Sequence, residues 1–100
     1  MDNATLMDLL ADVQNYLQIT WNDEETVKRL RELILGSAAY LDSVMGESCE
    51  YSTPGNLRTL LFERVRYQYN GALDAWLPNY LSLVMAAQNE VRVRRNADQT

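Results

Sequence analysis

Apolar residues recur every three or four positions along most of the chain, which is the spacing of one face of an α-helix. Four such stretches, separated by turn and capping residues, predict helices near residues 5–18, 23–45, 54–76 and 79–89. The first apolar stripe consists of Leu6, Leu9, Leu10, Val13 and Leu17, and the second of Val27, Leu30, Ile34, Ala38, Leu41 and Met45. The pattern therefore predicts an all-α fold, a small bundle of about four helices.

Local signals in the first half of the chain mark where the helices begin and end. Thr5 or Asn3 is expected to cap the first helix. Asn22, with Glu25 three residues later, is expected to cap the second helix, because its side-chain oxygen can accept from a free amide of the first turn. Gly46 is expected to end the second helix in the left-handed conformation.

In the second half, Thr53 with Pro54 at the first helical position, or else Asn56, is expected to start the third helix. Pro78 is expected to break the helical run after Trp76, since proline disfavours a helical residue before it. Trp76 itself is expected to anchor the core or a corner of the fold. The fourth helix is expected to carry one face formed by Leu81, Val84, Met85 and Gln88.

The pattern changes after the fourth helix, where valine and arginine alternate as in a strand. We therefore expect one helical domain over residues 1–90 and an extended C-terminal arm over 91–100. In an extended segment the two valines share one face, which can be buried on a neighbouring subunit while the arginines meet acidic groups. The candidate assembly interface is Val91, Arg92, Val93, Arg94 and Arg95. Deletion of residues 91–100 is then expected to weaken assembly without changing the thermal midpoint; a solvated tail is the alternative.

Composition is that of a single globular domain, with 100 residues, 47% of them apolar and 23% charged. The net charge of −5 has the wrong sign for general binding of duplex DNA. The charge is unevenly placed, because residues 1–50 hold three basic and ten acidic residues, and 51–100 hold six arginines and four acids. Such an asymmetry favours head-to-tail association, with chance as the alternative.

Candidate chemistry is sparse, since the chain has no histidine and one cysteine. A Ser-His-Asp or Cys-His catalytic group cannot be built within one chain, and a zinc site would need a nearly all-carboxylate shell. Cys49 lies between Glu47 and Glu50, which favour an inert thiol. We therefore expect no enzyme activity, no cofactor and no metal. The N-terminal residues lack the basic segment of a signal peptide and no run spans a bilayer, so we expect no membrane association.

Arginine and tyrosine alternate in the predicted third helix, and two interpretations stay open. The residues concerned are Arg58, Arg64, Arg66, Tyr67 and Tyr69. They can stack on and neutralise a single-stranded nucleic acid. Alternatively, the aromatic rings pack in the core and the arginines pair with acids of the same chain.

Four segments, in this order and spacing, carry a resemblance to a known family. They are Asp12–Glu24 with its Tyr16-Leu17-Gln18-Ile19 run, Ala39-Tyr40-Leu41-Asp42 followed by Gly46, Leu60–Tyr67 followed by Asn70-Gly71-Ala72-Leu73, and Tyr80-Leu81-Ser82-Leu83. Together they cover about residues 6–90 and resemble the small head–tail connector (adaptor) proteins of tailed phages. Gln14 and Gln18 depart from the family pattern, in which Lys or Arg is frequent at these positions.

The resemblance implies an all-helical structural protein of the virion, located at the head–tail interface and made in the cytoplasm of the bacterial host. It implies a cyclic homo-oligomer of about twelve subunits, which sits below the portal and extends its DNA channel. The implied partners are the portal protein and a tail-completion or stopper protein. DNA would pass through without sequence-specific binding, which suits the acidic composition.

A small helical phage regulator that binds DNA or a single host protein is the alternative function. A DNA-binding regulator would need a recognition helix with exposed basic or amide side chains. The segment from Arg58 to Arg66 is the candidate for that helix.

Overall fold

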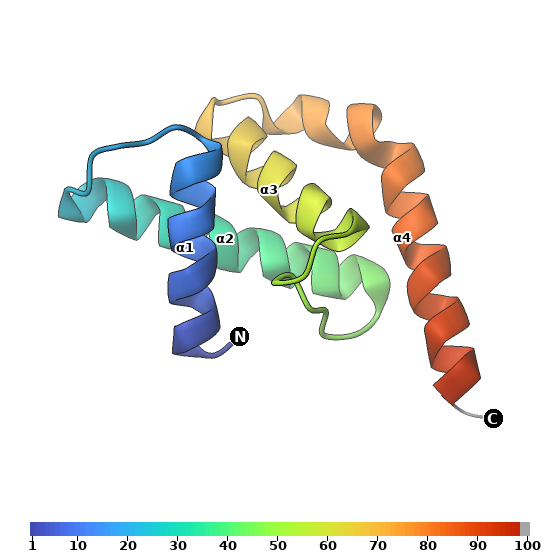
Figure 1. Cartoon of the computed structure of the whole chain (residues 1–100). Coiled ribbons are helices and arrows are strands. Elements are labelled where there is room, and N and C mark those ends of the chain that lie inside the picture. The colour runs from blue at the N-terminus through green and yellow to red at the C-terminus, as the bar shows by residue number, and fades with distance from the viewer. Residues whose placement is uncertain (99–100) are drawn as a thin grey trace.

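The computed structural model describes residues 1–98, which form four α-helices and one short 3₁₀ helix (Figure 1). The elements are α1 (Asn3–Tyr16), α2 (Glu24–Met45), α3 (Asn56–Tyr69), η1 (Leu73–Ala75) and α4 (Trp76–Asp98). No strand occurs within these residues. The predicted all-α bundle is confirmed.

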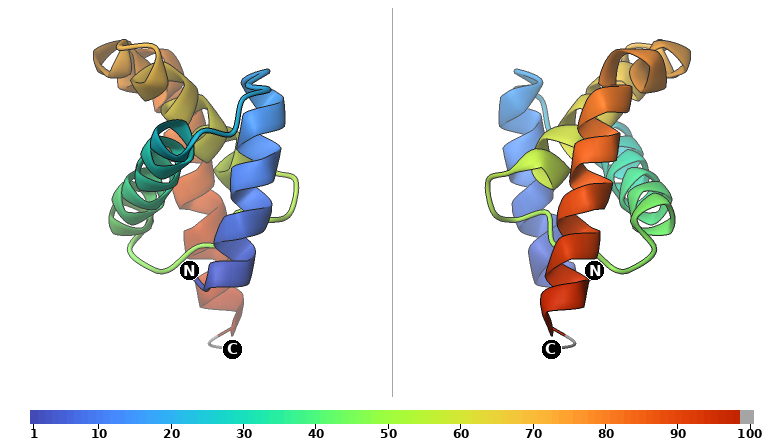
Figure 2. Two further views of the ribbon diagram at one scale, coloured as in Figure 1. Left: turned by 90° about the vertical axis from the view of Figure 1, so that its left-hand side faces the viewer. Right: turned by 90° about the vertical axis from the view of Figure 1, so that its right-hand side faces the viewer.

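The helices α2 and α3 pack against each other at the centre. α1 crosses α2, and α4 lies farther along, at the C-terminal end of α2 (Figure 1 and Figure 2). The helix α4 starts beside the end of α3 and runs down past the C-terminal end of α2 (Figure 1). The buried apolar residues of all four helices form one core, and the loop residue Tyr51 joins it. The apolar stripes predicted for α1 and α2 supply much of that core, including Leu6, Leu9, Leu10, Val13, Leu30, Ile34, Ala38, Leu41 and Met45.

The N-caps of α1 and α2 differ from the predicted ones by one or more residues. Asp2 caps α1, where its carboxylate accepts from the Thr5 amide at 2.7 Å. Asp23 caps α2 and accepts from the amide of Thr26 at 3.1 Å. Asp and Asn have similar capping ability, so the sequence signal identified the turn but not the residue. Gly46 ends α2 with a φ of 82°, as predicted.

The boundary between α3 and α4 lies earlier than predicted, so the expected helices over 54–76 and 79–89 are both wrong in extent. α3 ends at Tyr69, and the chain turns through Gly71, which has a φ of 72°. Pro78 does not break a helix, because it lies in the first turn of α4, where an amide has no partner within the helix. α3 begins at Asn56, which was one of the two predicted starts.

Helix α4 continues without a break through residue 90 as far as Asp98, so the expected extended arm is wrong. Residues 99 and 100 of that arm lie outside the described residues. None of the helices within residues 1–98 combines the length and apolar character needed to cross a membrane.

Candidate assembly surface

The two valines of the candidate interface lie on different sides of α4. Val91 is only 2% exposed and belongs to the core, whereas Val93 is 58% exposed. Two residues along an α-helix correspond to a rotation of about 200°, while the strand-like alternation had predicted a shared face. The structure therefore does not bring Val91 and Val93 together as one strip for a neighbouring subunit.

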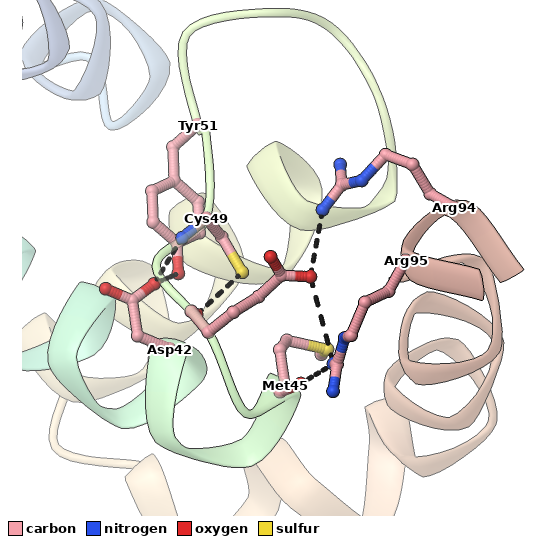
Figure 3. A network of polar contacts seen from close by, with 7 residues as sticks. Asp42, Met45, Cys49, Tyr51, Arg94 and Arg95 are labelled. Carbon is pink, nitrogen blue, oxygen red and sulfur yellow. Dashed lines mark hydrogen bonds and ion pairs between the residues drawn. The ribbon is translucent and has the colours of Figure 1, made fainter. Parts of the chain in front are cut away.

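The arginines of the same segment contact their own chain, as Figure 3 shows for Arg94 and Arg95. Nη2 of Arg94 donates to a carboxylate oxygen of Glu47 at 3.1 Å. Nη2 of Arg95 donates to the backbone carbonyl of Met45 at 3.2 Å and lies 3.8 Å from the same carboxylate. Nη2 of Arg92 donates to the Asn89 side chain at 2.9 Å. The acidic first half therefore meets part of the basic second half within one molecule.

Asp42 holds the loop that carries Glu47 in place (Figure 3). Its Oδ1 accepts from the Tyr51 hydroxyl at 2.7 Å and from the Cys49 amide at 3.0 Å. Burial, with the Asp42 hydrogen bond, raises the pKa of the Tyr51 hydroxyl well above its usual range. Burial and the charge of Asp42 also raise the pKa of the Cys49 thiol, which favours the unreactive form predicted from its acidic neighbours.

A different face of α4 is uncovered, and its apolar residues form what we call the α4 outer strip. This strip consists of Leu77, Leu81 and Met85, which are 41%, 48% and 59% exposed. Their spacing of four residues puts them on one side of the helix. The inner side instead carries Trp76, Val84, Ala87 and Val91. The predicted face that combined Leu81 and Met85 with Val84 is therefore wrong.

Sequence reasoning missed the outer strip because α4 is apolar on two sides. Leu77, Leu81 and Met85 follow one helical repeat, while Trp76, Tyr80, Val84, Ala87 and Val91 follow another. These two apolar repeats in one helix are the sequence signal that could have indicated a second, exposed apolar face. Periodicity alone does not say which repeat faces the core.

A groove that α4 does not line has a volume of about 470 Å³. We call it the α1–α2 groove, since it lies between the start of α1, the middle of α2 and the loop after α2. Its apolar lining is Met1, Leu35, Ala38, Ala39, Cys49 and Tyr51, and its polar lining is Asp2, Thr5, Asp42, Ser48 and Glu50. Within residues 1–98, no lysine or arginine lines it. The groove is therefore lined by apolar and acidic residues together.

The arginines of α3 are engaged within the chain, which supports the packing interpretation of the Arg–Tyr pattern. Arg58 pairs with Asp12 of α1 at 2.9 Å, and Arg66 pairs with Glu63 at 2.7 Å. The Arg64 guanidinium lies 4.3 Å from the ring centroid of Tyr40, and its Nη1 donates to the buried Ser37 hydroxyl at 3.0 Å. These contacts leave α3 poorly suited to present a row of free arginines to a nucleic acid.

Glu63 is the one buried carboxylate in the described part of the chain, at 7% exposure. It accepts hydrogen bonds from the Tyr16 hydroxyl and from Nε of Arg66, the latter at 2.8 Å. Burial opposes its ionisation, but these hydrogen bonds prevail and lower the pKa of the Glu63 carboxyl below its usual 4.5. Burial and the Glu63 carboxylate raise the pKa of Tyr16 to about 12.

A lowered pKa in the folded state means that ionised Glu63 stabilises the fold above pH 4.5 and that this contribution is lost as the pH falls further. We expect Glu63→Gln to lower the free energy of unfolding at pH 7. We also expect the free energy of unfolding of this variant to decrease less than that of the wild type as the pH falls. Urea unfolding at a series of pH values from 7 to 3 measures this. Glu32→Gln, at an exposed position of α2, is the matched control and should keep the wild-type decline. An unchanged decline in Glu63→Gln would contradict the expectation.

Neither similarity to known proteins nor a cluster of metal ligands identifies a functional site in this chain. No family model, no curated protein and no solved structure matches the chain. Within residues 1–98 no three Cys, Asp or Glu side chains come close enough together to hold a metal ion. The uncovered apolar surfaces of α4 and of the α1–α2 groove are therefore the features on which a functional interpretation depends.

Proposed function

We propose that this chain is a non-enzymatic structural subunit that assembles into a ring, as a head–tail connector of a tailed phage. The observation that carries the proposal is the α4 outer strip, three large apolar side chains in one row on a helix that borders solvent. A row of this kind is typical of a surface that a partner covers. The resemblance of the four sequence segments to connector proteins supports the same function.

In this function the ring would have about twelve subunits and would sit between the portal and a tail-completion or stopper protein. The net charge of −5 favours passage of DNA without binding, because phosphate contacts depend on clustered basic residues. The ion pairs of Arg58, Arg66, Arg94 and Arg95 within the chain reduce the number of free cations further. The proposed location is the virion, at the head–tail interface.

The purified chain is expected to form closed rings as its concentration rises, seen by negative-stain imaging and by native mass. We expect Leu81→Glu to raise the concentration needed for assembly at least about tenfold, because a leucine buried in an interface contributes about 1.5–3 kcal/mol. Ser82→Glu is the matched control, since Ser82 is exposed on the same helix about 100° away from Leu81. It should assemble like the wild type.

A monomer or a closed dimer at every concentration would contradict the connector proposal. Such a result would favour the small regulator that binds DNA or a host protein. Equal effects of Leu81→Glu and Ser82→Glu would instead show that the α4 outer strip is not the assembly surface.

A further inference from the structure

We propose that the α4 outer strip of one copy docks into the α1–α2 groove of the next copy. This inference rests on the proposed function as a ring subunit and identifies the two surfaces that meet. Each surface is an uncovered apolar feature of the same molecule, and the groove adds carboxylates that an arginine on α4 can meet.

The α2 side of the groove permits a close contact. Leu35, Ala38 and Ala39 line the groove and lie on one side of α2. The distance between packed helices depends on the side chains at their contact, and alanine allows a close approach. A second helix with protruding side chains can therefore pack closely against α2 there.

The α4 outer strip supplies the protruding side chains. Leu77, Leu81 and Met85 extend over two turns of α4, and residues 77–89 carry no charge. Burial of this strip therefore takes no charged side chain of α4 into the interface, where an unpaired charge would be costly. Exposed Leu35 and Met1 at the groove would be covered by the same contact.

Charge complementarity favours the groove as the surface that the strip meets. The groove is lined by Asp2, Asp42 and Glu50, whose carboxylates accept hydrogen bonds from their own chain and keep acceptor capacity for a further donor. On α4, Arg92 follows Met85 by seven residues, about 10 Å along the helix axis, and lies on the same side. An arginine at the end of an apolar strip matches a groove that is lined by both apolar and acidic residues.

The placement of the two surfaces makes the contact head-to-tail. The strip belongs to α4, whereas the groove is lined by α1, α2 and the loop after α2, so the two surfaces share no residue. A contact between two different surfaces leaves a free strip at one end and a free groove at the other. Repetition of such a contact closes into a ring or continues as a filament.

Cysteine crosslinking tests this contact in the full chain. In a Cys49→Ser background, Ala39→Cys places a thiol in the groove and Met85→Cys places one on the strip; both positions are exposed. With copper phenanthroline as oxidant, the double variant should give a ladder of dimers, trimers and larger species. A mixture of the two single variants should give covalent dimers only, and neither variant alone should crosslink.

The matched control replaces Met85→Cys by Ala86→Cys, which is exposed on the same helix but about 100° off the strip. It should crosslink to Ala39→Cys at least about tenfold more slowly, because a disulfide requires Cα atoms within about 7 Å. Self-crosslinking of Met85→Cys would show that strips meet strips and would overturn the inference, as would the absence of any ladder. Rings without the crosslink would overturn this contact and leave the connector proposal standing. A ladder that forms only open chains would support the contact and contradict the ring.

Discussion

Trp76→Ala is expected to lower the free energy of unfolding by about 3–5 kcal/mol, the largest effect of any single substitution proposed for this protein. Trp76 is 2% exposed at the start of α4. Its ring packs edge-on against Tyr40 at 5.9 Å and stacks on Tyr80 at 6.3 Å. The Arg64 guanidinium lies 5.8 Å from the same ring. One side chain thus joins α2, α3 and α4, so its loss leaves a cavity at their junction.

Urea unfolding of the monomer at pH 7 measures this loss. Trp76→Phe keeps an apolar ring and should lower the free energy of unfolding clearly less than Trp76→Ala does. Leu77→Ala is the matched neighbour, because Leu77 is 41% exposed, and it should change stability by no more than about 0.5 kcal/mol. An equal decrease in the free energy of unfolding for Trp76→Ala and Leu77→Ala would contradict the position of Trp76 in the core.

Removal of residues 91–100 is expected to destabilise the fold as well as to alter assembly, which reverses the expectation from the sequence. Val91 is buried against the core, and a fully buried valine contributes about 1.5–3 kcal/mol. The truncation also removes the contacts of Arg94 and Arg95 with the loop after α2, exposed ion pairs that add at most about 1 kcal/mol each. We therefore expect a loss of about 2 kcal/mol or more in the free energy of unfolding.

A chain that ends at Ala97 is the control, since it keeps Val91, Arg94 and Arg95. Thermal and urea unfolding should show a clearly lower free energy of unfolding for the chain that ends at residue 90 than for the chain that ends at Ala97. The Val91→Ala variant should account for about 1.5 kcal/mol of this difference, because each buried methyl group contributes about 0.8 kcal/mol. A chain truncated at residue 90 with wild-type stability would restore the interpretation of the segment as an independent arm.

The sequence by itself determined the helical class and most of the core of the first two helices. Leu6, Leu9, Leu10 and Val13 form a single apolar repeat with polar residues between them, so only one orientation of α1 buries them. Gly46 could be placed as the end of α2, because a left-handed residue after a helix is a local requirement that glycine meets without strain. The lack of histidine likewise restricts the chemistry of the chain in any fold, because a side chain that is absent cannot act as a base or a ligand.

Only the tertiary structure decided which side of α4 is the core side and where the basic C-terminal segment lies. α4 has two apolar repeats, and the packing of α2 and α3 selects the one that contains Trp76, Val84 and Val91. The Val-Arg alternation has the period of a strand, but burial of Val91 and contacts of Arg95 with the end of α2 stabilise a helix there. Such contacts join residues about 50 positions apart, so local periodicity could not predict them. The uncovered α4 outer strip and the α1–α2 groove exist for the same reason, because they are what remains exposed after packing has chosen the core.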